Sequence, residues 1–117
     1  MELLIDVVSN VGDDEFYRTA RYQIPLVVVL INSSDKDIFN IIEENIRQTD
    51  IIQQLSADLI VVFLTHTNHE ASLLCMEKIK NKIDFTYTLD EYKGLKPTFI
   101  KNLFIENMKM LGLYDGE

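Results

Sequence analysis

The sequence predicts a single α+β domain built on a four-stranded, mainly antiparallel sheet with helices packed on it. Two observations support this prediction. The 117 residues are 47% hydrophobic with only four Gly and two Pro, so burial of apolar side chains can offset the entropy lost on folding. Segments of strand and helix periodicity alternate along the chain, and no linker, repeat or low-complexity tract divides them. We therefore expect one domain over residues 1–117.

The strands follow from short apolar or alternating segments. Residues 24–31 are a β-branched run, which predicts a central strand covered on both faces. Residues 49–55 and 59–64 are spaced for a hairpin, and the second is apolar enough to be interior. Residues 84–89 alternate like a half-buried strand, which we expect to close the sheet.

The helices follow from apolar residues at helical spacing. We expect them at residues 13–22, 35–48, 69–83 and 99–111. Residues 1–9 fit a helix or a strand, and we interpret them as a helix. From residue 13 the order is α, β, α, β, β, α, β, α, which resembles a ferredoxin-like sandwich whose helices cover one face of the sheet.

The charge and the apolar runs exclude several classes of protein. With 19 acidic and 11 basic residues the formal net charge is −8, and no Lys or Arg stripe is present to follow phosphates, so we expect no nucleic-acid binding. The apolar runs are too short to cross a bilayer, and the acidic N-terminus lacks a signal peptide's basic leader. One cysteine, Cys75, suits a reducing compartment. A cytoplasmic protein without a membrane anchor is predicted.

The segment "RQTDIIQQLSADLIVVFL", from Arg47 to Leu64, resembles the central hairpin of the GGDEF domain of bacterial diguanylate cyclases, which join two GTP molecules into cyclic di-GMP. That family shows R-x-x-D, five residues, the five-residue signature and an apolar strand. "RYQIPLVVVLIN" and "THTNHEASLLCMEKIKNKI" are similar to the family's first strand and to the helix after the hairpin. The resemblance covers about residues 16–89 and implies a degenerate, shortened domain of nucleotide cyclase fold.

Carried over position by position, the resemblance implies that catalysis is lost. The counterpart of the signature is Ser56, Ala57, Asp58, Leu59 and Ile60. The turn glycines are thus replaced, and Leu59 stands in place of a metal-binding acid. Asn32 replaces the aspartate that would meet Mg²⁺, and Ser34 replaces its second acidic neighbour. Because this phosphoryl transfer needs carboxylates to hold hard cations, we expect no cyclase activity and no bound metal or cofactor.

A shortened connection supports the same expectation. Only residues 33–55 separate Asn32 from Ser56, which is enough for one helix and one strand, whereas the family places two helices there. The missing piece is the family's "F-K-x-x-N-D-x-x-G-H-x-x-G-D" stretch, whose Asn and Asp recognise guanine. GTP is therefore not expected in the usual cleft.

Arg47 and Asp50 match the R-x-x-D pair that binds cyclic di-GMP as a feedback inhibitor in many family members. An arginine can grip a phosphate or a guanine edge, and an aspartate can accept from guanine N–H groups. The alternative is an ion pair between the two side chains that binds no ligand. Both interpretations stay open at the level of sequence.

Three other patterns have simpler explanations. His66 and His69 lie beside Glu70, but zinc needs three or four convergent ligands, so a surface loop is preferred. Cys75 lies on the apolar side of its helix with no activating neighbour, which indicates core packing. "VGDDEF", residues 11–16, looks like the signature itself but precedes the first strand, so its acids are predicted to begin a helix.

The predicted function is a noncatalytic signalling or protein-interaction module derived from a cyclase fold. It is a cyclic di-GMP receptor if Arg47 and Asp50 bind ligand. One form of interaction is a homodimer through the N- or C-terminal helix. The alternative is an uncharacterised small α+β enzyme, or an active cyclase with an unusual site.

Overall fold

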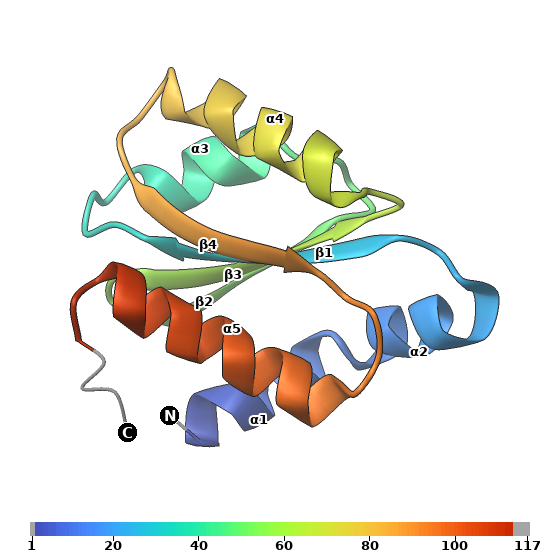
Figure 1. Cartoon of the computed structure of the whole chain (residues 1–117). Coiled ribbons are helices and arrows are strands. Elements are labelled where there is room, and N and C mark those ends of the chain that lie inside the picture. The colour runs from blue at the N-terminus through green and yellow to red at the C-terminus, as the bar shows by residue number, and fades with distance from the viewer. Residues whose placement is uncertain (1, 114–117) are drawn as a thin grey trace.

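The protein has three layers, with a sheet between two layers of helices (Figure 1). The computed structural model describes residues 2–113. Within them lie α1 (Glu2–Val11), α2 (Asp13–Tyr22), β1 (Leu26–Asn32), α3 (Ile38–Glu44), β2 (Ile51–Ser56), β3 (Leu59–Thr65), α4 (His69–Lys80), β4 (Thr86–Glu91) and α5 (Lys96–Met110). None of these helices is both long and apolar enough to cross a membrane.

The sheet is wholly antiparallel, with strand order β2-β3-β1-β4. This arrangement confirms that β1 is central and β3 interior. The closing strand is β4, which begins two residues later than predicted, at Thr86. Thr86 pairs with the last residue of β1, Asn32, and Phe85 before it is buried in the core instead of joining the ladder.

Helices cover both faces of the sheet, so the prediction that they cover one face is wrong. In Figure 1, α3 and α4 lie on one face and α1 and α5 on the other. Alternate residues of β1 reach two separate cores: Val27, Val29 and Ile31 on the α3/α4 face, and Leu26, Val28 and Leu30 on the α1/α5 face. The central strands have no polar face, so both faces must be covered to keep them from water.

The connection from β1 to β2 contains one helix, α3, as expected from its length. This helix is shorter than the predicted 35–48. Before it, the Asp35 side chain accepts from the backbone N–H of Asp37 at 2.9 Å and forms a turn. After it, the Asn45 side chain donates to the carbonyl of Ile41 at 2.7 Å and closes the last turn. Side-chain bonds to the backbone at both ends therefore limit the helix.

The "VGDDEF" stretch begins a helix, as predicted. Gly12 precedes α2, and Asp13, Asp14 and Glu15 occupy its first turn. The prediction of a helix at residues 1–9 is confirmed by α1, although Met1 lies outside the described residues. α2 is fixed to the core by Phe16, whose ring packs edge-on against Phe63 and Tyr92.

Candidate functional site

The end of β1 and the β2–β3 turn bring together the two positions that the resemblance assigns to metal-binding acids. Asn32 and Leu59 are direct partners in the antiparallel ladder, so their side chains lie on the same face of the sheet. The backbone N–H of Ser33 also donates to the carbonyl of Asp58 at 3.1 Å, which holds the turn beside β1. The two positions are thus adjacent, and what they can bind depends on their side chains.

Asn32 is bound to α5. Its side-chain oxygen accepts from Asn107 Nδ2 at 2.7 Å, its own Nδ2 donates to Asn107 Oδ1 at 3.3 Å, and Asn107 Nδ2 also donates to Thr88 Oγ1 at 3.2 Å. Asn107 is buried. Neither Asn107 nor Thr88 was predicted as a site residue from the sequence, although a polar residue within the apolar face of a helix was a usable signal. These amides attach α5 to the sheet and carry no charge.

The rest of the turn offers little to a cation. Leu59 is buried and belongs to the core on the α1/α5 face. The Ser56 hydroxyl donates to Asp58 Oδ1 at 3.1 Å, so the aspartate retained from the signature bonds within its own turn. Over residues 2–113, no three His, Cys, Asp or Glu side chains gather as metal ligands.

Arg47 and Asp50 face each other across a tight turn between α3 and β2. The side chain of Asp50 is only 2% exposed. Its Oδ2 accepts from the Arg47 backbone N–H at 2.8 Å, and its Oδ1 accepts from the Thr65 backbone N–H at 3.0 Å and from Arg47 Nη2 at 3.3 Å. Arg47 Nη2 also donates to the Thr65 carbonyl and to Thr67 Oγ1. The pair therefore ties the start of β2 to the end of β3.

The side chain of Arg47 is accessible to solvent, whereas that of Asp50 is not. The Arg47 side chain is 54% exposed and lies between two surface hollows of about 270 and 220 Å³. Glu43, Gln48 and Ile52 line one, and Thr67, Ala71 and Cys75 line the other, with Arg47 and Asp50 on both. A ligand could reach Arg47 from solvent, whereas both oxygens of Asp50 already accept hydrogen bonds.

Comparison with known proteins gives one informative result. No protein-family model and no curated protein matches this chain. Among solved structures it is similar to one described as "The crystal structure of a DGC protein from Thermotoga maritima", where DGC abbreviates diguanylate cyclase. The TM-score is 0.63 and the identity 15%, and the match covers 89% of this chain and 91% of that chain. This chain has a diguanylate cyclase-like fold. At such low identity the likeness establishes the fold alone.

Cys75 lies on the α3/α4 face of this cyclase-like fold, partly buried against the core. Burial is the main cause that raises the pKa of its thiol, and the negative charge of Asp50 raises it further. The positive charges of Lys78 and Arg47 lower it by less. A raised pKa keeps the thiol protonated near neutral pH, which agrees with packing and not with nucleophilic chemistry.

The two histidines lie where β3 ends and α4 begins. His66 is exposed, and its backbone is in the left-handed region at φ 51°. His69 begins α4, where its backbone N–H donates to the carboxylate of Glu91 at 3.0 Å. The carboxylate of Glu91 therefore accepts a hydrogen bond from the first turn of α4, which favours a negative charge at that place.

Proposed function

We propose that this chain is a noncatalytic signalling or protein-interaction domain built on a diguanylate cyclase-like fold. The observation that carries this proposal is the pair Asn32 and Leu59. They are ladder partners at the place where the resemblance requires carboxylates, yet one is an amide bonded to Asn107 and the other is buried. A neutral amide and a leucine supply no negative field to hold Mg²⁺ against a triphosphate.

The test of lost catalysis is incubation of the purified chain with GTP and Mg²⁺, followed by chromatography for cyclic di-GMP. We expect no product. The double variant Asn32→Asp, Leu59→Glu should also be inactive, because the family's guanine-recognition stretch is missing between β1 and β2. A known diguanylate cyclase is the positive control, and turnover by the unmodified chain above a blank preparation would refute the proposal.

As the ligand of this domain we propose cyclic di-GMP, bound through the guanidinium of Arg47. This residue is half-exposed beside two hollows. Its Nε and Nη2 already donate to Asp50, and its Nη1 carries two further N–H groups that can donate to a phosphate. Use of Asp50 as a guanine acceptor would first require loss of its hydrogen bonds to Thr65. Recognition therefore rests on Arg47, with Asp50 holding the turn on which it stands.

Calorimetric titration with cyclic di-GMP tests this ligand. We expect saturable heat from the unmodified chain and about a tenfold or greater loss of affinity for Arg47→Ala, because a charged hydrogen bond is removed. Arg21→Ala is the control, since Arg21 is also an exposed arginine and lines neither of the two hollows beside Arg47. No heat from folded protein at high micromolar ligand would reject the receptor role and leave the loss of catalysis untouched.

For the interaction itself we propose a homodimer through α1 or α5. Leu3 on α1 is 76% exposed, and Met110 and Leu111 at the end of α5 are also exposed. Light scattering during size-exclusion chromatography should show a mass that rises with concentration, and Leu3→Glu or Met110→Glu should reduce it. A monomer at every concentration would reject this interface.

A further inference from the structure

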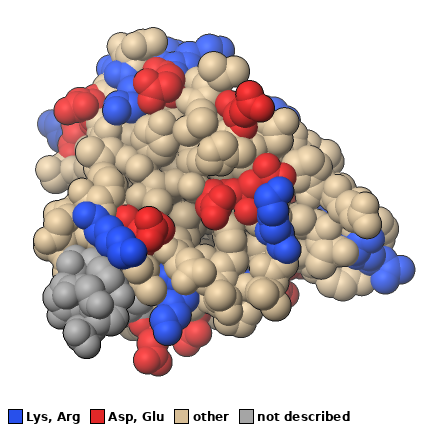
Figure 2. Space-filling view, in the orientation of Figure 1, with Lys and Arg blue, Asp and Glu red and all other residues tan. Residues whose placement is uncertain are grey.

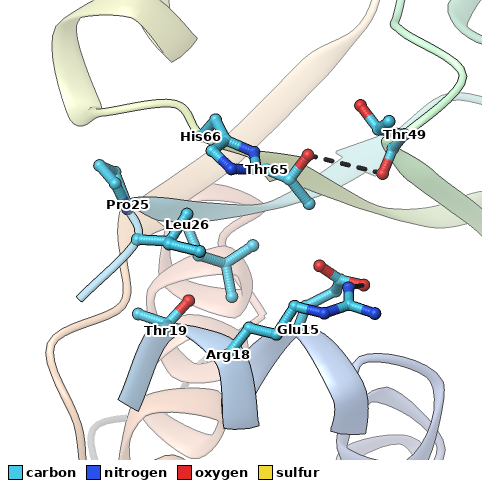
Figure 3. A pocket seen from close by; sticks show the side chains of 9 residues that line it. Glu15, Arg18, Thr19, Pro25, Leu26, Thr49, Thr65 and His66 are labelled. Atoms are coloured by element: carbon cyan, nitrogen blue, oxygen red, sulfur yellow. Dashed lines mark hydrogen bonds and ion pairs between the residues drawn. The ribbon is translucent and has the colours of Figure 1, made fainter. Parts of the chain in front are cut away.

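A cavity of about 230 Å³ lies at the end of the sheet opposite the Asn32–Leu59 pair (Figure 3). Here the start of β1 meets the end of β3, and α2 forms the facing wall through Glu15, Arg18 and Thr19. A second hollow of about 440 Å³ adjoins it on the β4 side, and both are lined by Thr19, Ile24 and Pro25. The segment that connects α2 to β1 therefore has a hollow on each side.

The cavity combines an apolar wall with one pair of opposite charges. Ile24, Pro25 and Leu26 supply the apolar wall. On α2, Arg18 Nη1 and Glu15 Oε2 are 2.7 Å apart, and Figure 3 shows both side chains on the cavity side of the helix. A ligand that fills this space meets a cation and an anion next to each other, beside a surface that favours hydrocarbon.

The backbone around the cavity is strained. His66, which lines it, has φ 51°, whereas the φ of 57° at Gln23 belongs to the C-cap of α2, where this conformation is common. Residues other than glycine seldom adopt this conformation, and where they do they are concentrated at binding sites. This strain is an observation independent of the charges on α2.

We propose that this cavity binds a free α-amino acid with an apolar side chain. The carboxylate would pair with Arg18, the ammonium group with Glu15, and the side chain would pack on Ile24, Pro25 and Leu26. A simple anion would be opposed by Glu15 and a simple cation by Arg18, whereas a zwitterion matches both. The volume suits one amino acid. Its lining shares no residue with the two hollows beside Arg47, so the site is separate from the one proposed for cyclic di-GMP.

The test is titration of the ¹⁵N-labelled full chain with L-leucine, followed by NMR. We expect saturable shifts of the amide signals of Thr19, Leu26, Thr65 and His66. N-acetyl-L-leucine and L-leucine amide, which each lack one charge, should bind about tenfold more weakly or worse. Arg18→Gln and Glu15→Gln should weaken L-leucine binding similarly. Arg21→Gln, on the same helix but outside the cavity lining, is the control and should leave binding unchanged.

Two results would overturn the proposal. One is the absence of saturable shifts with leucine, isoleucine, valine, methionine or phenylalanine at millimolar concentration while the spectrum stays dispersed. The other is equal binding of leucine and its two singly charged analogues by the unmodified chain, which needs no variant to fold. The Arg47→Ala chain should bind leucine normally. Failure here would thus be distinguishable from failure of the cyclic di-GMP proposal.

Discussion

Replacing Gly12 by alanine should lower the free energy of unfolding by about 3 kcal/mol, because the added methyl group overpacks a closed core. A Cβ at this position would lie 2.2 Å from Phe63 Cε2 and 3.0 Å from Phe16 Cε2. Phe63 is fully buried and cannot move aside. The backbone at Gly12 has φ −96°, which alanine adopts freely, so the cost is steric. Urea unfolding followed by circular dichroism measures it, since the chain has no Trp.

A double-mutant cycle separates the clash from other effects of the substitution. Phe63→Leu removes ring atoms that the new methyl group would strike, at its own cost in stability. In that background Gly12→Ala should cost less than about 1 kcal/mol, so the two changes should couple strongly. Equal costs of Gly12→Ala in both backgrounds would show that the contact with Phe63 is not the reason for glycine.

This prediction also explains the misleading likeness of "VGDDEF" to a catalytic signature. In a cyclase hairpin, glycines let the turn approach GTP, whereas Gly12 lets the junction of α1 and α2 approach Phe63 on β3. The acids that follow lie in the first turn of α2, and Asp13 pairs with Lys96 on α5 at 3.1 Å. Packing thus explains the glycine and the acids of this stretch, whereas phosphate and metal binding explain them in a cyclase signature.

The sequence was informative wherever the deciding contacts are local or periodic. The central position of β1 and the interior position of β3 followed from the apolar run at 24–31 and from the hairpin, and residues 33–55 were too short for two helices. The contacts that the sequence did not reveal are long-range. Asn107 reaches Asn32 from the last helix, and nothing in the local pattern of α5 specifies that partner. The apolar run of β1 implied that both faces of the sheet are covered. The sequence pattern of each helix, however, does not say which face of the sheet it covers.

The space-filling view adds a surface property that a net charge of −8 does not give. On the face shown in Figure 2, basic and acidic side chains are interspersed, and no basic stripe crosses it. Residues 2–113 form five ion pairs, and three of them join residues three apart on the chain. Such exposed pairs contribute little to stability individually. The pair that includes Asp50 is different because the carboxylate is buried.

Replacing Asp50 by alanine should therefore lower the free energy of unfolding by about 3 kcal/mol, close to the effect at Gly12. The substitution leaves the backbone N–H groups of Arg47 and Thr65 without their acceptor and removes the partner of the Arg47 guanidinium. Asp58→Ala is the matched control. Asp58 is an exposed aspartate in the next turn whose side chain accepts from Ser56, and its loss should cost less than about 1 kcal/mol.

Comparison with Arg47→Ala decides between the two meanings of the R-x-x-D pair. Arg47 is half-exposed, and its removal leaves Asp50 bonded to two backbone N–H groups, so we expect a cost of only about 1 kcal/mol. A large loss at Asp50 with a small one at Arg47 means that the aspartate is retained for folding and the arginine is available for a ligand. If Asp50→Ala leaves unfolding unchanged, the aspartate has no structural role, and ligand binding becomes the better explanation for both residues.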